Sequence, residues 1–467
     1  MRGRRIPIPL PNTGAMSRRK NTFCIRSSLA IFVVLFILIQ FQVFNYTDVR
    51  ETTIGDVTND STAAILSMVP SVFHKFLTTK TRNQSVVHNG TQSGYVELYH
   101  PPNITEIKKM IAKYNELQLV LNEDIFGPLQ NDSVIIVVQV HTRITYLRHL
   151  IVSLAQAKDI SKTLVVFSHD YYDEDINDLV QSIDFCKVLQ IFYPFSIQTH
   201  PFEFPGVDPG DCPRDIKKDQ AIIRNCNNAL HPDLYGHYRE AAFTQTKHHW
   251  WWKANRVFDQ LEVTRFHTGL VLFLEEDHYV AEDFLYLLEL MQKRSLELCP
   301  QCNILSLGTY LKTFNYYTYN SKVEVMPWIS SKHNMGFAFN RSTWKGIHRC
   351  AEHFCSYDDY NWDWSLQHVS QQCLRHKLHA MIVKGPRVFH IGECGVHHKK
   401  KNCESNQVIS KVQQVLKIAR NSGQMFPKSI TLTVASLIKK TKLRKGNGGW
   451  GDRRDHTLCL NMTLTTR

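Results

Sequence analysis

Short apolar runs alternate with amphipathic stretches along the middle of the chain. The apolar runs are typical of strands buried on both faces and lie at 134–140, 163–168, 188–193, 269–274 and 304–307. Apolar residues at helical spacing predict helices at 146–157, 176–183, 246–261 and 283–295. This alternation predicts an α/β fold with a Rossmann-like, mainly parallel sheet and helices on both of its faces.

A longer apolar run lies near the N-terminus. Residues 29–44 contain no charged residue, and basic residues precede them. The arrangement predicts a transmembrane signal anchor at 27–44, with a cytosolic tail at 1–26 and a lumenal remainder, which is a type II topology. No small-x-small site follows the run, so a cleaved signal peptide fits less well, and a buried core helix is the alternative.

The rest of the chain divides by composition. Residues 45–130 are rich in Thr, Ser and Asn and predict a stem, in which the apolar spacing of 103–121 predicts a helix packed on the domain. Residues 131–467 form the expected catalytic domain. From Trp328 on, little periodicity is visible, and we expect this part to be a cap that helps to form the site.

Charge and sequons agree with a lumenal domain. The formal net charge is +13, and removing the 7 basic residues of the tail leaves +6, which does not indicate a nucleic-acid partner. Glycosylation sequons crowd before residue 132, as expected of a glycosylated stem. They begin at Asn45, Asn59, Asn83, Asn89, Asn103, Asn131, Asn340 and Asn461.

The cysteines fit an oxidising compartment. Apart from Cys24 beside the anchor, their number is odd, so at least one is free, and Cys186 in an apolar stretch is the best candidate. Cys212 and Cys226 are placed to anchor a long insertion at 195–247. The pair Cys299 and Cys302 could be half of a zinc site or a redox motif, but a structural disulfide is favoured because no second CxxC is present.

Acidic residues follow the strand at 269–274. Glu275, Glu276 and Asp277 come directly after it, and ligands in open α/β sheets gather outside the carboxyl ends of strands. Oxygen ligands there suit Mg²⁺ or Mn²⁺ against a diphosphate, and a solvated acidic turn is the alternative. No GxGxxG, Walker loop or GxSxG elbow is present, which argues against a dinucleotide cofactor, a kinase and a serine hydrolase.

Further polar residues occur at other strand ends and in aromatic surroundings. Residues 139–143 and Asp170 close the first two strands, where they could contact a nucleotide or serve as ordinary loop residues. In the helix that follows Gln245, core packing is favoured for two of the three tryptophans 250–252, because three neighbours cannot share one face. The string YDDYNWDW at 357–364 combines rings with carboxylates, as sugar binding requires, although its aspartates could simply cap a helix.

Long strings of the sequence resemble one known family. They are VVQVHTR, LVVFSHD, FPGVDPGDCPRD, FTQTKHHWWWK, LFLEEDHY, LSLGTY, HNMG, YDDYNWDW, CGVHHKK and NGGWGDRRDH. They run from about residue 131 to 460 and are similar to the N-acetylglucosaminyltransferase II family of Golgi glycosyltransferases, whereas the tail and the stem show no such likeness. The resemblance implies a GT-A fold and an inverting transfer of GlcNAc from UDP-GlcNAc, in β1,2 linkage, to the α1,6-arm mannose of the N-glycan core.

The same resemblance implies roles for individual residues. Mn²⁺ ligands fall on Asp277 and His390, and the general base falls on Asp363. Donor contacts fall on Gln139, Val140, His141, Thr142, Arg143, Asp170, Gln245, Thr246, Lys247, His248 and His249. The implied disulfides are Cys212–Cys226, Cys299–Cys302, Cys350–Cys373, Cys355–Cys459 and Cys394–Cys403. Asn334 and Trp362 are candidate acceptor contacts.

One departure from the family concerns the donor site. Phe314 stands where the family has an arginine, and nearby Lys312 cannot reproduce a bidentate fork. The alternative functions are an inactive, membrane-tethered glycan-binding protein and a sibling GlcNAc-transferase with another mannose acceptor. The expected partners are UDP-GlcNAc, an N-glycan acceptor and the Golgi membrane, while homodimer formation is left open.

Overall fold

A computed structural model describes residues 65–78, 102–310, 314–392, 405–433 and 446–464. The chain divides into two compact units, Met1–Ala64 and Ile65–Arg467, and all the described residues belong to the second unit. The expected signal anchor at 27–44 lies outside them. Within the described ranges, no helix is long and apolar enough to span a membrane.

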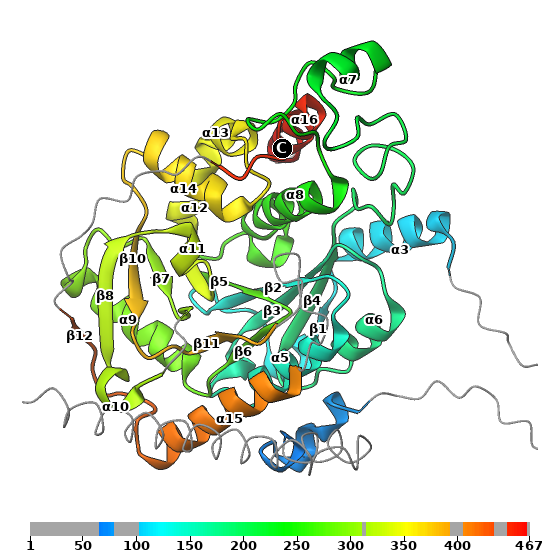
Figure 1. Cartoon of the computed structure of the whole chain (residues 1–467). Helices are drawn as coiled ribbons and strands as arrows, with labels where there is room; N and C mark the ends of the chain where they lie inside the picture. The colour runs from blue at the N-terminus through cyan, green and yellow to red at the C-terminus, as the bar shows by residue number, and fades with distance from the viewer. Residues whose placement is uncertain (1–64, 79–101, 311–313, 393–404, 434–445, 465–467) are drawn as a thin grey trace, which may run out of the picture. The chain divides into compact units, whose positions relative to one another are not determined.

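One large sheet forms the centre of the fold (Figure 1). Its strands are hydrogen-bonded in the order β1-β4-β3-β2-β5-β9-β7-β10-β8-β12, and β4, β3, β2 and β5 are parallel to one another. β9 runs antiparallel to both β5 and β7. The strands of this sheet are β1 (Val120–Leu121), β2 (Ile135–Val140), β3 (Leu164–His169), β4 (Lys187–Phe192), β5 (Leu270–Glu275), β7 (Ile304–Ser306), β8 (Lys322–Pro327), β9 (Phe337–Asn340), β10 (His379–Val383) and β12 (Thr431–Leu432).

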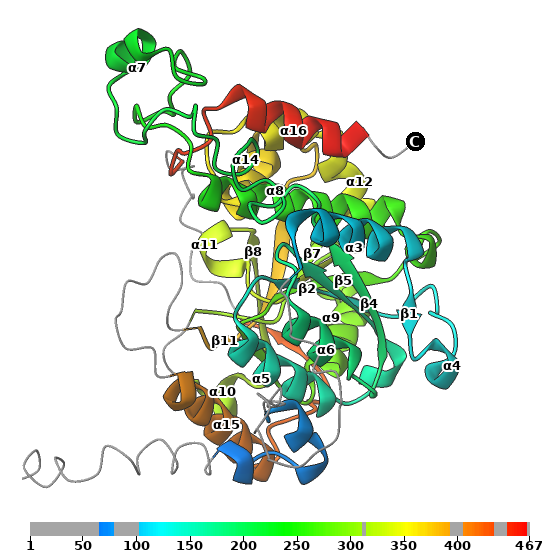
Figure 2. The same ribbon diagram turned by 90° about the vertical axis from the view of Figure 1, so that its right-hand side faces the viewer.

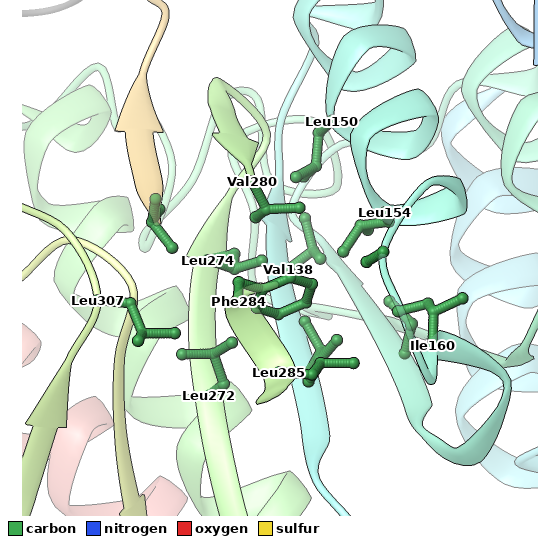
Figure 3. Packing of buried hydrophobic residues seen from close by; sticks show 14 of the residues in the cluster. Val138, Leu150, Leu154, Ile160, Leu272, Leu274, Val280, Phe284, Leu285 and Leu307 are labelled. Carbon is green, nitrogen blue, oxygen red and sulfur yellow. The ribbon is translucent and has the colours of Figure 1, made fainter. Parts of the chain in front are cut away.

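Helices cover both faces of the sheet because successive strand residues point to opposite sides. In β2, Ile136 and Val138 pack with helices α5, α6 and α9, whereas Ile135 and Val137 pack with α8, α12, α13 and α14. Figure 3 shows the first of these cores, in which Val138 lies near Leu150 of α5. Figure 2 shows α8, α14 and α16 together on the opposite side of the sheet. The expected α/β layering is therefore confirmed.

The helix bounds are as follows: α3 (Ile104–Leu117), α4 (Glu123–Phe126), α5 (Ile144–Ala155), α6 (Glu174–Gln181), α7 (Lys218–Arg224), α8 (Ala241–Asn255), α9 (Phe284–Leu298), α10 (Tyr316–Tyr319), α11 (Ser330–His333), α12 (Arg341–Arg349), α13 (Ala351–Ser356), α14 (Trp362–Gln372), α15 (Ser405–Asn421) and α16 (Arg453–Leu464). Short 3₁₀ turns lie at Ser71–Phe76, Ile160–Lys162 and Glu262–Thr264, and a π-helical turn, Arg256–Gln260, continues α8. The predicted strands correspond to β2, β3, β4, β5 and β7, and the predicted helices to α5, α6, α8 and α9.

The helix expected in the stem is α3. Asn103 caps it in a reciprocal capping box with Glu106, which satisfies backbone N–H groups of the first turn. Its buried Ile107 and Ile111 form a small apolar cluster with Tyr172 and Phe192, as predicted for a helix that packs on the domain.

The part of the chain after Trp328 has more regular structure than its periodicity indicated. Helices α12, α13, α14 and α16 form there, held by large aromatic contacts rather than by repeated small apolar residues. Trp251 stacks on Phe354 of α13, with ring centroids 4.3 Å apart, and contacts Trp344 of α12 at 5.4 Å. All three tryptophans of α8 are buried in this core, not only two as we expected.

A separate two-stranded ribbon joins distant parts of the chain. β6 (His278–Val280) follows the acidic residues after β5, and it pairs antiparallel with β11 (Val388–His390). The register places His278 opposite His390, and the Ile391 amide donates to the Asp277 carbonyl at 2.8 Å. The ribbon thereby brings His390 to the end of β5.

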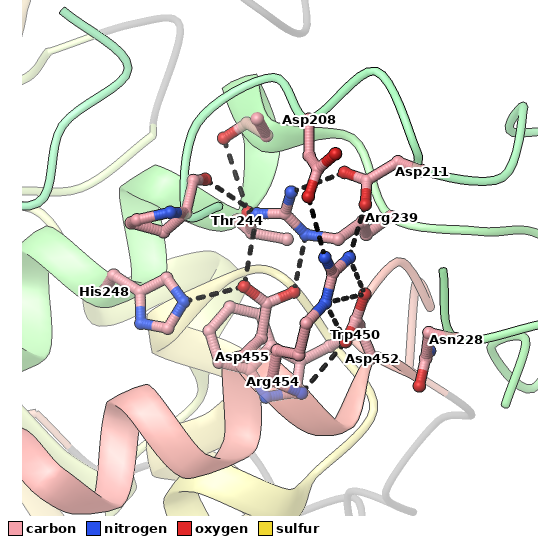
Figure 4. A network of polar contacts seen from close by, with 12 residues as sticks. Asp208, Asp211, Asn228, Arg239, Thr244, His248, Trp450, Asp452, Arg454 and Asp455 are labelled. Carbon is pink, nitrogen blue, oxygen red and sulfur yellow. Dashed lines mark hydrogen bonds and ion pairs between the residues drawn. The ribbon is translucent and has the colours of Figure 1, made fainter. Parts of the chain in front are cut away.

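The insertion between β4 and α8 is fastened by a network of buried ions (Figure 4). Arg239 donates to Asp455 of α16 at 2.9 Å and to Asp211 of the insertion at 3.0 Å. Asp211 also contacts Arg454, and His248 of α8 lies 2.9 Å from Asp455. Arg239 and Asp455 are almost inaccessible, so the charges are compensated inside the protein.

Four disulfides are present in the described residues: Cys212–Cys226, Cys299–Cys302, Cys350–Cys373 and Cys355–Cys459. These coincide with four of the pairs that the family resemblance implies. The fifth expected pair, Cys394–Cys403, lies outside the described ranges. Cys186 is free and buried, and burial raises the pKa of its thiol, as expected for an unreactive core cysteine.

A buried ion pair behind the ribbon gives a test of the fold. Asp283 accepts from Nε and Nη2 of Arg387 at 2.8 and 3.0 Å, and neither side chain is exposed. Asp283→Asn leaves the guanidinium buried without its counter-charge, so we expect a loss of about 3–5 kcal/mol in the free energy of unfolding. Glu297→Gln, which breaks the exposed pair with Arg294, should change it by less than about 1 kcal/mol. Equal effects of the two substitutions in urea denaturation would contradict the prediction.

Candidate active site

The carboxyl ends of three parallel strands meet at one edge of the sheet. Gln139 of β2 is paired in register with Ser168 of β3 on one side and with Glu275 of β5 on the other. The residues that follow these positions therefore lie next to one another. The convergence of the three strand ends that the sequence predicted is confirmed.

Glu276 organises the loop after β2. Its carboxylate accepts from the backbone N–H groups of His141, at 2.8 Å, and Arg143, at 3.3 Å. It also accepts from Arg143 Nε at 2.8 Å, while Arg143 Nη1 lies 2.9 Å from Asp277 Oδ2. Although burial opposes it, these carboxylates raise the pKa of Arg143. Glu276 is thus a supporting residue that orients the loop after β2. Arg143 and His390 both contact the carboxylate of Asp277.

Asp277 is the centre of the acidic cluster. Its Oδ2 lies 3.0 Å from His390 Nε2, and its Oδ1 is buried with no hydrogen-bond partner among the described residues. Burial favours the neutral carboxyl, but the His390 hydrogen bond and nearby cations hold the pKa of Asp277 well below its usual range. A Cβ on Gly392 would lie only 2.2 Å from Asp277 Oδ2, so glycine is required at this close approach.

These groups fit a divalent cation. Ligand atoms of Glu275, Asp277 and His278 lie within 4.8 Å of one another, and carboxylate oxygen with imidazole nitrogen is a donor set that suits Mn²⁺. His278 is nearly inaccessible, and its Nδ1 accepts from the Glu275 amide at 3.1 Å. His390 is about a third exposed with its Nε2 at Asp277, so we regard it as the better nitrogen ligand. The unpartnered Oδ1 of Asp277 is the oxygen ligand that such an ion would use.

Asp170 links the end of β3 to the neighbouring loop and to α8. Its Oδ1 lies 2.6 Å from His141 Nδ1, and its Oδ2 accepts from Gln245 Nε2 at 2.9 Å and lies 3.4 Å from His249 Nδ1. Burial raises the pKa of this carboxyl, but the hydrogen bonds from His141 and His249 hold it well below its usual range. Asp170 thus joins three other expected donor-binding residues, namely His141, Gln245 and His249. Of these, His141 is exposed and so available to a ligand.

Other residues expected to bind the donor lie inside the protein. Lys247 Nζ donates to the carbonyls of Tyr357 and Asp359, both at 3.0 Å, and lies 4.0 Å from the centre of the Trp450 ring. His248 binds Asp455. Both side chains are fully buried on the face of α8 that is turned to the cap, so the expectation that they contact a ligand is wrong for this structure.

The remaining positions of these two segments differ in exposure. The side chain of Val140 is a core residue, so only its backbone is available to a ligand. Thr142 is exposed and Thr246 half-buried, and their roles as donor contacts stay predictions.

Asp363 lies in the first turn of α14. Its Oδ2 accepts from Asn334 Nδ2 at 3.0 Å, and the Asn334 Oδ1 accepts from the Tyr310 hydroxyl at 3.0 Å. Burial raises the pKa of Asp363 to about 7, with further increases from Asp359 and Glu275 and opposition from the Trp364 amide. A raised pKa of this kind is typical of a general base near neutral pH.

The structure revises the expectation for Trp362 and shows what Phe314 contacts. Trp362 is buried and stacks on Trp250, with centroids 4.7 Å apart and planes 2° from parallel, so it supports α14 from the core and is not an acceptor contact. Phe314, at the position of the family arginine, packs edge-on against Phe389 at 5.3 Å. It therefore supports the residue before His390, while Lys312 lies outside the described ranges.

Sequence reasoning missed Lys253 and Tyr310. Lys253 is fully buried and donates to Gln139 Oε1 at 2.5 Å. Its position four residues after His249 and eight after Gln245 is a helical-face signal that could have revealed it. Tyr310 carried no comparable signal, because its contact with Asn334 arises only when the chain folds.

Comparisons with known proteins identify the family of this chain. The family model described as N-acetylglucosaminyltransferase II (MGAT2) matches residues 108–459. The alpha-1,6-mannosyl-glycoprotein 2-beta-N-acetylglucosaminyltransferase of Rattus norvegicus is 45% identical over 75% of this chain and 79% of its own length. The proteins of the same name from Homo sapiens and Arabidopsis thaliana are 44% and 35% identical, over 75% and 74% of this chain and 78% of each relative.

A solved structure of residues 1–349 of Staphylococcus aureus TarS has 9% identity and a TM-score of 0.29, over 62% of this chain and 74% of that one, which is too low a likeness to support an argument about the fold. The sequence match covers far more than half of the chain, and the residues at the strand ends form one connected site. The chain is a glycosyltransferase that belongs to the N-acetylglucosaminyltransferase II family.

Proposed function

We propose that this enzyme transfers GlcNAc from UDP-GlcNAc, with inversion, in β1,2 linkage to the α1,6-arm mannose of the N-glycan core. The names of the relatives describe 2-β-N-acetylglucosaminyl transfer to an α-1,6-mannosyl glycoprotein. The observation that carries the proposal is Asp363, a buried carboxylate in the first turn of α14 whose two oxygens accept from Asn334 Nδ2 at 3.0 Å and from the Trp364 amide at 2.9 Å. A single base opposite a leaving-group site is what one displacement requires.

The donor would lie along the ends of β2, β3 and β5. His141 is exposed beside Asp170, and Arg143 is partly exposed beside Asp277, so an imidazole ring and a guanidinium cation are available to a nucleotide and its diphosphate. Asp170 holds His141, Gln245 and His249 in one arrangement, which reduces the ordering required when the donor binds.

Asp277 and His390 are the residues that we propose to hold Mn²⁺. When bound there, the ion would supply positive charge to the departing diphosphate. The chain itself contributes Arg143, whose guanidinium lies at the same carboxylate and can stabilise negative charge on the leaving group.

On the acceptor side, Asp363 would take the proton of the mannose O2 hydroxyl as this oxygen forms the new bond to C1 of GlcNAc and UDP departs. Asn334 donates to one carboxylate oxygen of Asp363 and the Trp364 amide to the other, which fixes the orientation of the base. Inversion follows from a single attack on the face opposite UDP, and no covalent enzyme intermediate is needed.

The proposed cellular setting follows from the sequence. The uncharged run at 27–44 with its basic flank supports single-pass type II anchoring in the Golgi membrane, and the sequons and disulfides suit a lumenal domain. Incubation of the lumenal part with UDP-GlcNAc, MnCl₂ and defined N-glycans tests the activity. Product on another mannose would favour a sibling specificity, and glycan binding without product would favour a glycan-binding protein.

Removal of the central carboxylate charge should abolish metal binding together with the activity. Asp277→Asn keeps the side-chain shape but removes the anionic ligand, so we expect turnover to fall at least about 100-fold and calorimetric Mn²⁺ binding to be lost. Glu324→Gln, on β8 and four strands away from β5 in the sheet, is the control and should leave both unchanged. Tight Mn²⁺ binding by folded Asp277→Asn would contradict the ligand assignment.

Loss of the base should affect chemistry rather than donor binding. For Asp363→Asn we expect kcat to fall by about 10²–10⁴ because an amide cannot accept the hydroxyl proton, while the Kd for UDP remains within about twofold. Single-turnover kinetics and calorimetry measure the two quantities. A near-normal kcat would remove Asp363 from the mechanism.

The acid limb of the pH profile should report the same residue. A base acts in its ionised form, and the pKa of Asp363 is raised to about 7, so kcat/KM should fall as the pH decreases below about 7 and level off above it. The residual activity of Asp363→Asn should lack this limb. A wild-type profile that is flat between pH 5 and 8 would be inconsistent with the assignment.

A further inference from the structure

A row of polar side chains crosses three strands beneath α8. Ser168, Gln139 and Glu275 are neighbours in register on β3, β2 and β5. The residues two positions before each, namely Val166, Val137 and Phe273, belong to the core on the α8 side, so all three polar side chains point toward that helix. The row forms the inner wall of the proposed donor site.

α8 contacts this row and the adjoining Asp170 through residues spaced four apart. Gln245 donates to Asp170, His249 Nε2 lies 2.8 Å from Ser168 Oγ, and Lys253 Nζ donates to Gln139 Oε1 at 2.5 Å. Residues at this spacing share one face of a helix.

The Lys253 contact determines which way the Gln139 amide points. A protonated lysine donates three hydrogen bonds and accepts none, so the amide group presents its oxygen to the charged amine of Lys253. The Nε2 group of Gln139 then does not face Lys253, and it makes no hydrogen bond within the described part of the chain. Gln139 is half-buried, which leaves this N–H₂ group accessible at the strand ends.

We propose that Lys253 is a positioning residue, which holds Gln139 so that its two N–H donors face oxygen atoms of the bound nucleotide. This role rests on the proposed use of UDP-GlcNAc and assigns it a residue that does not itself touch the donor. Burial of the Lys253 amine carries a desolvation cost that an apolar side chain of the same size would avoid. Packing alone therefore does not explain a lysine at this position.

A contrast with a second buried lysine supports the proposal. Burial lowers the pKa of Lys253 to about 7, but Glu275, the next member of the row, opposes this shift most strongly and so favours the protonated amine that donates to Gln139. By contrast, Lys247 on the same helix donates to two backbone carbonyls of the cap and covers Trp450, a staple that involves no side chain of the row. Helix α8 therefore carries two buried lysines, of which Lys253 contacts the polar row and Lys247 contacts the cap.

The experiment compares Lys253→Met with Lys247→Met, a substitution matched in burial. Calorimetric titration with UDP in the presence of MnCl₂ gives the Kd, and thermal unfolding confirms that each variant is folded. We expect the Kd for UDP to rise about tenfold in Lys253→Met, as for loss of one charge-assisted hydrogen bond, and to change less than about twofold in Lys247→Met despite a similar decrease in Tm. With UDP-GlcNAc, Lys253→Met should raise KM with little change in kcat.

Gln139 provides an independent test that does not depend on the folding of Lys253→Met. Gln139→Glu keeps an acceptor for Lys253 but removes both N–H donors, so the chain should be at least as stable while its Kd for UDP rises about tenfold. In the double variant Gln139→Leu/Lys253→Met, the Kd for UDP should be no higher than in Gln139→Leu alone. Each substitution removes the same Lys253–Gln139 contact, so their effects should not multiply.

The outcomes separate the two proposals. Wild-type binding of UDP by folded Lys253→Met or by Gln139→Glu, or multiplicative effects in the double variant, would overturn the positioning role and leave the proposed function intact. Failure of the wild-type chain to bind UDP would overturn the proposed function and this role with it.

Discussion

Burial of negative charge at the ends of parallel strands is the constraint on which this structure depends. Asp170, Glu276 and Asp277 are all nearly inaccessible, and an ionised carboxylate in such a place needs hydrogen-bond donors or a cation. The donors come from the loop after β2, from α8 and from β11, which are far apart in the sequence. Compensation of these few carboxylates therefore brings together the three segments that make the site.

The sequence predicts the central sheet and the location of the site because the signals there are local. Continuous apolar runs identify β2 to β5, and the polar residues directly after them must meet once the strands are parallel and in register. The approach of His390 to Asp277 is different, since it depends on an antiparallel pairing between two three-residue strands with no pattern of their own. Only the family resemblance indicated it.

Orientation around α8 could not be predicted for a physical reason. Most of its residues are buried, so the helix has no polar side to mark the surface, and Gln245 and His248 are equally plausible as site residues. Their roles are decided by what packs on each side: the row on β2, β3 and β5 on one, and α14 and α16 on the other. Trp362 follows the same rule, because its ring is drawn into the aromatic core while the neighbouring Asp363 remains at the site.

The position of α16 has a consequence for biosynthesis. Asp455 and Thr463 bind Arg239 and Trp251, which precede them by 216 and 212 residues, and Cys459 bonds to Cys355 across 104 residues. During translation, the polar groups of α8 and the insertion are made long before the helix that satisfies them. The domain thus cannot complete its core until α16 has emerged from the ribosome.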